Sequence, residues 1–146
     1  MNTRNSKWEY VHVKNATSVN RNGWLLTGGV TFYKSNIQLN HLSISGAGGE
    51  DGLNIIDSKF ELKNCSFLGA SSDAFDGDFV QGKIENCLFK NILGDGLDFT
   101  EAVKASFTIL FLTTLSSRLR PFFCSFSLSS RGTISSRSTS TPIFAK

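Results

Sequence analysis

The chain has 146 residues, 40% of them apolar and 18% charged, which suits one folded domain and is not a disordered composition. Charge is divided unevenly along the chain. Residues 1–101 contain all 12 acidic residues against nine Lys and Arg, a net −3, whereas residues 102–146 contain six Lys and Arg and no acid, a net +6. Two chemically different segments are therefore joined near residue 101.

Several classes of protein are disfavoured by this composition. The apolar run at 105–115 is well short of the roughly 20 residues that a membrane helix requires, so we expect no membrane span. The opening residues lack the apolar stretch of a signal peptide. Three cysteines are too few and too widely spaced for a disulfide framework or a paired-cysteine metal site. No stacking aromatics alternate with the basic residues, so we expect no nucleic-acid partner.

A repeat with a period near 22 residues dominates the first segment. Looser copies of the repeat at Val11–Ala16 and Ile37–Ile44 precede the clear ones. The clear copies, each pair 22 residues apart, are the acidic turns Asp51–Asn54, Asp73–Asp76 and Asp95–Asp98, and the segments Leu62–Phe67 and Ile84–Phe89. Self-similarity at a fixed period of this length is the signature of a repeat architecture.

Within each copy, apolar residues recur at every second position rather than every 3.6. Phe60 and Leu62, then Cys65 and Phe67, alternate with polar residues, and Asn64 breaks the alternation once. This pattern predicts short strands joined by a corner. A unit of about 22 residues cannot bury its apolar side alone, whereas stacked units bury a continuous column. We therefore predict an all-β fold, a right-handed parallel β-helix of about four coils.

Stacking in this register predicts columns of like residues. Leu53, Phe75 and Leu97 would form one internal stack, and Asn64 over Asn86 would form an asparagine ladder at a corner. A second internal stack pairs Phe67 with Phe89. The alignment also places Cys65 over Cys87, either as a disulfide or redox switch or as two reduced thiols in a buried column.

The segments Ser72–Phe79, Gly82–Cys87, Gly94–Phe99 and Gly23–Tyr33 resemble bacterial right-handed parallel β-helix repeat proteins, a branch of the pectate-lyase-like superfamily. The resemblance covers about residues 8–100. It implies an extracellular or cell-envelope protein and a polysaccharide partner, in a group that includes lyases, hydrolases, adhesins and proteins without known activity. The arginine and histidine signatures of pectate lyases and polygalacturonases have no counterpart here, so the resemblance does not establish a reaction.

The acidic turns form the candidate site. Stacking puts Asp51, Asp73 and Asp95 in one column and Asn54, Asp76 and Asp98 in another, with Asp78 nearby. Hard oxygen ligands suit Ca²⁺, and the candidate calcium ligands are Asp73, Asp76, Asp78, Asp95 and Asp98. Two other interpretations remain: turn aspartates that accept backbone N–H groups, and a carboxylate pair, Asp76 and Asp98, for sugar hydrolysis.

Other candidate residues have simpler interpretations. His12 and His41 fall at polar positions of alternating strands, where we expect solvated side chains. Trp8, Trp24 and Tyr33 are either sugar-stacking platforms or packing residues.

The repeat does not extend to the end of the chain. One more strand is predicted at 103–111, where apolar residues alternate and Phe111 follows Phe89 by 22 positions. We therefore assign the β-helix to 8–112 and a low-complexity Ser/Thr/Arg tail to 113–146, which is disordered, a poorly patterned cap, or the product of a reading-frame change in a longer protein. A solenoid without caps exposes strand edges, so we also expect end-to-end self-association.

These observations favour a non-enzymatic β-helix segment of a secreted or surface bacterial protein, structural or carbohydrate-presenting. The alternative is a fragment of a polysaccharide lyase or glycoside hydrolase acting on acidic polysaccharide. A lyase requires a basic residue beside the acids, and Lys83 and Lys90 fall in the following strand or turn rather than in the acidic turns. We assign no catalytic residue, and calcium is the one candidate cofactor.

Overall fold

The computed structural model describes residues 4–100, 104–111 and 122–129, and every regular element in these ranges is a β-strand. The first sheet is parallel and has the order β13-β11-β8-β5. Its strands are β5 (Gly28–Tyr33), β8 (Asp51–Ile56), β11 (Asp73–Asp78) and β13 (Asp98–Thr100). The described part of the chain contains no helix that could cross a bilayer.

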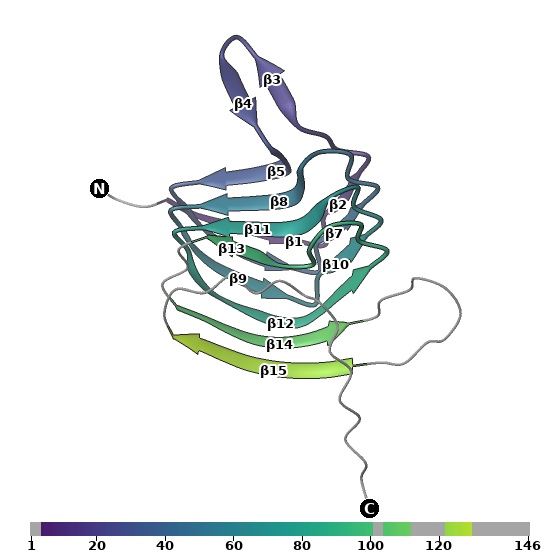
Figure 1. The fold of residues 1–146 in the computed structure, drawn as a ribbon. Helices are drawn as coiled ribbons and strands as arrows, with labels where there is room; N and C mark the ends of the chain where they lie inside the picture. Colours follow the sequence, from purple (N-terminus) through teal and green to yellow (C-terminus); the bar gives the residue numbers. More distant parts are fainter. Residues whose placement is uncertain (1–3, 101–103, 112–121, 130–146) are drawn as a thin grey trace, which may run out of the picture.

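The second sheet is longer and bends around the molecule (Figure 1). One face of it is formed by the parallel strands β1 (Arg4–Glu9), β6 (Ser35–Asn40), β9 (Lys59–Lys63), β12 (Gln81–Lys90) and β14 (Lys104–Phe111). The other face is formed by β2 (His12–Lys14), β7 (Ser43–Ser45), β10 (Ser66–Leu68) and the last residues of β12.

The chain therefore winds into a parallel β-solenoid, which confirms the predicted class. Three turns are complete: β5-β6-β7, β8-β9-β10, and β11 followed by the long β12. The strands β1 and β2 at one end and β13 and β14 at the other belong to partial turns, so the molecule has about three coils rather than the four predicted. The register confirms the period, because Asp76 pairs with both Asn54 and Asp98.

Residues in the left-handed backbone region turn the chain at all three corners of each coil. Asn64 and Asn86 occupy one corner with φ of 54° and 51°, and Asp57 occupies another with φ of 46°. At the third corner Gly46 and Gly69 have φ of 64° and 70°. Asn, Asp and Gly tolerate this conformation better than other residues do. At four of these corners the N–H donates to a carbonyl of the next turn: Asn64 to Glu85 at 3.0 Å, Asp57 to Asp78 at 2.9 Å, Gly46 to Leu68 at 2.8 Å and Gly69 to Lys90 at 2.9 Å.

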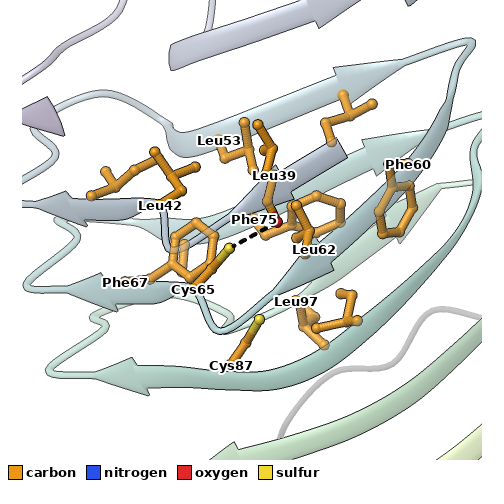
Figure 2. Close-up of a cluster of buried hydrophobic side chains, with 14 of the residues drawn as sticks. Leu39, Leu42, Leu53, Phe60, Leu62, Cys65, Phe67, Phe75, Cys87 and Leu97 are labelled. Carbon is orange, nitrogen blue, oxygen red and sulfur yellow. Dashed lines mark hydrogen bonds between the residues drawn. The ribbon is translucent and has the colours of Figure 1, made fainter. Parts of the chain in front are cut away.

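The interior contains the predicted columns (Figure 2). Leu53 pairs in register with Phe75, and both are fully buried. The Phe67 and Phe89 rings stack with centroids 4.9 Å apart and planes 3° from parallel. The asparagine ladder is also confirmed, since Asn86 Nδ2 donates to Asn64 Oδ1 at 2.7 Å.

Cys65 and Cys87 are free thiols buried in this interior, which confirms the interpretation as reduced cysteines. Cys65 Sγ donates to the Leu39 carbonyl at 3.5 Å, the contact drawn as a dashed line in Figure 2. A hydrogen bond with Cys65 and burial raise the pKa of the Cys87 thiol, so it stays protonated.

The second segment of the chain is described only in part. The predicted strand is confirmed as β14, which pairs with β12 and places Phe111 opposite Phe89. Within the predicted tail, β15 (Phe122–Ser129) pairs antiparallel with β14, a strand that the sequence pattern did not indicate. The rest of the tail, 113–121 and 130–146, lies outside the described residues, so its predicted character stays a prediction.

An additional hairpin interrupts the first partial turn. Its strands, β3 (Val19–Arg21) and β4 (Trp24–Leu26), pair only with each other. Asn22 and Gly23 connect them, both with positive φ, as a two-residue hairpin turn requires.

Candidate functional site

A polar row crosses the outer surface of the first sheet. Asn54 on β8, Asp76 on β11 and Asp98 on β13 are directly opposite one another in register. Their neighbours Leu53 and Phe75 are buried in the interior, so the row lies on the opposite face of the sheet because side chains alternate along a strand. Asn54 is nevertheless buried, with 3% of its surface exposed, while Asp76 and Asp98 are half-buried. The second predicted column is therefore confirmed. We call Asn54, Asp76 and Asp98, with the flanking Asp73 and Asp78, the acidic row.

The first predicted column is confirmed only in part. Asp51 and Asp73 pair in register on β8 and β11. Asp95 lies before β13, outside any strand, and its backbone N–H donates to Asp73 Oδ1 at 2.6 Å. Asp73 therefore supports the next turn of the chain, as the interpretation of turn aspartates predicted.

Asn54 links the two columns, although we did not predict it as a ligand-binding residue. Its Nδ2 lies 3.0 Å from Asp76 Oδ2, 3.2 Å from Asp51 Oδ2 and 3.1 Å from Thr27 Oγ1. An amide nitrogen has two hydrogens, so three acceptors share them. Asn54 Oδ1 is buried and has no donor among the described residues. The signal that could have identified Asn54 was its alignment with Asp76 and Asp98.

Burial and like charges make three carboxylates of the row, Asp73, Asp76 and Asp78, harder to ionise. The pKa of Asp76 is raised to about 7, first by burial and then by Asp78, Asp51, Asp98 and Asp73. The pKa values of Asp73 and Asp78 are also raised, with burial as the main cause. The ion pairs found between described residues, Lys7–Glu9, Lys34–Asp57 and Lys83–Glu85, lie elsewhere. The row is therefore an acidic surface without a paired Lys or Arg in the described part of the chain.

The arrangement offers hard oxygen donors but not a closed metal cage. Across the described ranges, no three His, Cys, Asp or Glu side chains are grouped so that they could hold one metal ion. Asp76 and Asp98 are neighbours across adjacent strands, while Asp78 lies two residues further along β11. The donor set thus fits a cation held by one or two carboxylates and by water, and the predicted set of five ligands stays a prediction.

The histidines behave differently from one another. His12 is exposed on β2, which agrees with the solvated side chain that we predicted. The prediction for His41 was wrong, because His41 occupies a corner with φ of 56° rather than a strand position. Its ring stacks on Tyr10 with centroids 4.6 Å apart, and its Nδ1 is buried without a partner among the described residues.

The aromatic candidates do not gather at the acidic row. Trp8 packs edge-to-face on Phe32 at 5.1 Å and is a packing residue. Trp24 lies on the hairpin and is exposed. Tyr33, at the end of β5, and Phe79, directly after Asp78, are exposed near one corner, and Phe79 was not predicted.

Two shallow grooves lie on another surface. They have volumes of about 320 Å³ and 200 Å³ and are lined by polar residues of β1, β6 and β9, such as Gln38 and Glu61. Neither of these grooves includes the acidic row, which lies on a different sheet.

Comparison with known proteins gives no relative: no family model, no curated protein and no solved structure matches this chain. The strand register is therefore the evidence for the fold, and the acidic row is the feature that bears on function.

Proposed function

We propose that this chain is a non-enzymatic segment of a secreted or surface bacterial β-helix protein that presents the acidic row to a ligand. The observation that carries the proposal is the column formed by half-buried Asp76 and Asp98 on neighbouring strands, with the buried Asn54 in register beside Asp76. Parallel strands space such groups regularly, about 4.8 Å apart. A rigid sheet thus holds oxygen donors in fixed positions, as binding sites require.

The ligand that suits this surface is Ca²⁺, alone or bridging to the hydroxyl and carboxyl groups of an acidic polysaccharide. Ca²⁺ binds six to eight oxygens in a flexible geometry. Water or sugar oxygens can therefore complete a coordination shell to which Asp76, Asp78 and Asp98 contribute. With so few protein ligands we expect weak binding, with a dissociation constant on the order of 0.1–1 mM, typical of extracellular modules.

The positions of the lysines support a non-enzymatic role over a lyase. Lys83 forms an ion pair with Glu85 on the outer surface of β12, in the second sheet. Lys90 is exposed at the end of the same strand. Neither residue stands in the acidic row, where a base for proton abstraction would be needed.

A hydrolase remains the second candidate because of one observation. Asp76, with a pKa raised to about 7, lies directly opposite Asp98 on the adjacent strand. Retaining glycosidases use two carboxyl groups about 5 Å apart, one of which is an acid with a raised pKa. If this alternative holds, both residues are required for cleavage of an acidic polysaccharide.

The test is a titration of the full chain with Ca²⁺, followed by calorimetry and by thermal melting, with Mg²⁺ as the competing ion. We expect heat and a raised melting temperature with Ca²⁺, both lost in Asp76→Asn and Asp98→Asn. Asp57→Asn is the matched control, because Asp57 is an exposed aspartate outside the row, paired with Lys34. An unchanged melting temperature at millimolar Ca²⁺ would refute calcium binding. Release of reducing ends from polygalacturonate, lost in Asp76→Asn, would instead establish the hydrolase.

A further inference from the structure

The tip of the β3–β4 hairpin is exposed and is held by its own two strands. Residues 21–26 are all exposed, and among the described strands β3 and β4 pair only with each other, ending with Arg21 opposite Trp24. Figure 1 shows the hairpin standing away from the stacked turns. Its base is fixed, because Ser18 Oγ donates to the Thr27 carbonyl at 2.7 Å. Since isolated hairpins are marginally stable in water, the tip can open while the solenoid stays folded.

Asn22 and Gly23 form the turn at this tip. Both have left-handed backbone conformations, with φ of 53° and 81°. A methyl group in place of a Gly23 hydrogen would meet no described atom within 4 Å, so the turn is open to water. Glycine also has no side chain to hinder the approach of its backbone nitrogen to the amide carbon of Asn22. The turn therefore places a reactive pair of groups on an exposed and weakly held segment.

We propose that Asn22 is a site of spontaneous deamidation, by which the chain modifies the turn of its own hairpin. The Gly23 backbone nitrogen bonds to Asn22 Cγ, the Cγ–Nδ2 bond breaks, and the amide leaves as ammonia with the proton from the Gly23 nitrogen. Water then opens the resulting five-membered succinimide ring. The net reaction converts asparagine and water into an aspartyl residue and ammonia, so it requires no enzyme and no oxidant.

The other asparagines lack this combination of features. Among all asparagines of the sequence, only Asn22 is followed by glycine. Asn20 is exposed on β3 of the same hairpin but precedes Arg21, whose side chain hinders the attacking nitrogen. Asn64 also has a left-handed backbone, yet its Nδ2 and Oδ1 are both engaged in the ladder hydrogen bonds. The reaction should therefore be confined to the hairpin turn.

The two products differ in their effect on the hairpin. When water cleaves the bond from Cγ to the ring nitrogen, aspartate results, which tolerates the left-handed conformation and can keep the turn. When water cleaves the main-chain bond, isoaspartate results. Its main chain is one methylene longer, so the two-residue turn can no longer hold Arg21 opposite Trp24. Both products add a negative charge to a hairpin whose one charged residue is Arg21. The inference does not depend on the acidic row or its ligand.

The test is tryptic peptide mass spectrometry of the full chain during incubation at mildly alkaline pH, with a digest taken before incubation as the background. Trypsin cleaves after Arg21 and so separates Asn20 from Asn22. We expect the Asn22 peptide to gain one dalton progressively, with isoaspartate detected by enzymatic methylation. The Asn20 peptide is the internal control and should stay unchanged. Asn22→Gln should lose the gain, because glutamine would have to close a larger ring.

A second measurement tests the role of the exposed tip. Because opening the tip costs little, the native chain should convert at most about 10-fold more slowly than the chain unfolded in guanidinium chloride. Both measurements can be made on the wild-type chain, so they do not depend on the folding of a variant. Three results would overturn the inference: no conversion at Asn22, equal conversion at Asn20, or protection of native Asn22 beyond that factor.

Discussion

Replacing Asp76 with asparagine should remove a pH-dependent loss of stability. The pKa of Asp76 is raised from 3.8 to about 7 in the folded chain, so the folded state binds the proton more tightly than the unfolded state does. The stabilisation by this proton is fully present below pH 3.8, and it is lost as the pH rises through about 7. Wild-type stability should therefore fall between these limits, and Asp76→Asn should fall less.

The magnitude follows from the size of the shift. A shift of roughly three pKa units corresponds to about 4 kcal/mol if the carboxyl were fully shielded. The Asp76 side chain is only partly buried, and solvent screens its interaction with Asp78 and Asp98, so we expect about 1–2 kcal/mol. Asp73 and Asp78 are shifted in the same direction, so some pH dependence should persist in the variant.

The assay is urea unfolding of both proteins at a series of pH values from 4 to 8, followed by circular dichroism. The difference in unfolding free energy between Asp76→Asn and wild type should grow in favour of the variant as the pH rises. A difference that stays constant with pH, or that shifts toward the wild type, would refute the electrostatic reasoning.

Three further predictions concern the stacked turns. Phe75→Ala should lower the unfolding free energy by about 3–5 kcal/mol in the same urea assay, because the ring is fully buried; a loss below about 1 kcal/mol would contradict the packing. Asn64→Ala should cost about 1–2 kcal/mol by losing the ladder hydrogen bonds and straining a left-handed corner, whereas Asn64→Gly, which relieves the strain, should cost less. Cys65 and Cys87 should resist alkylation until the chain unfolds, as peptide mass spectrometry can show; rapid labelling of native protein would contradict their burial.

The sequence predicts contacts between equivalent residues of successive coils far better than contacts within one coil. Because stacked turns repeat every 22 residues, the opposition of Asp76 and Asp98 and the ladder of Asn64 and Asn86 could be foreseen. The contact of Asn54 with Asp51 could not, since it depends on the path of β8 rather than on the period.

The remaining differences also have physical causes. His41 was placed on a strand because its corner lacks the Asn that marks the later coils. The hairpin was not predicted because it falls outside the repeat, although Asn22-Gly23 is a turn signal that could have revealed it. Strand β15 lies in a Ser-rich segment without acidic turns. Because it pairs antiparallel with β14 and is not a copy of the 22-residue repeat, the repeat could not predict it.

The most direct test of the account is a cross-link within the acidic row. Residues 76 and 98 are opposite each other on adjacent parallel strands, so their Cα atoms should lie about 5 Å apart, within the range that a disulfide spans. The variant Asp76→Cys/Asp98→Cys should therefore form a disulfide readily under mild oxidation. Asp78→Cys/Asp98→Cys, displaced by two residues along β11, should not. Equal cross-linking of the two pairs, or preference for the displaced pair, would contradict the register on which both the solenoid and the acidic row depend.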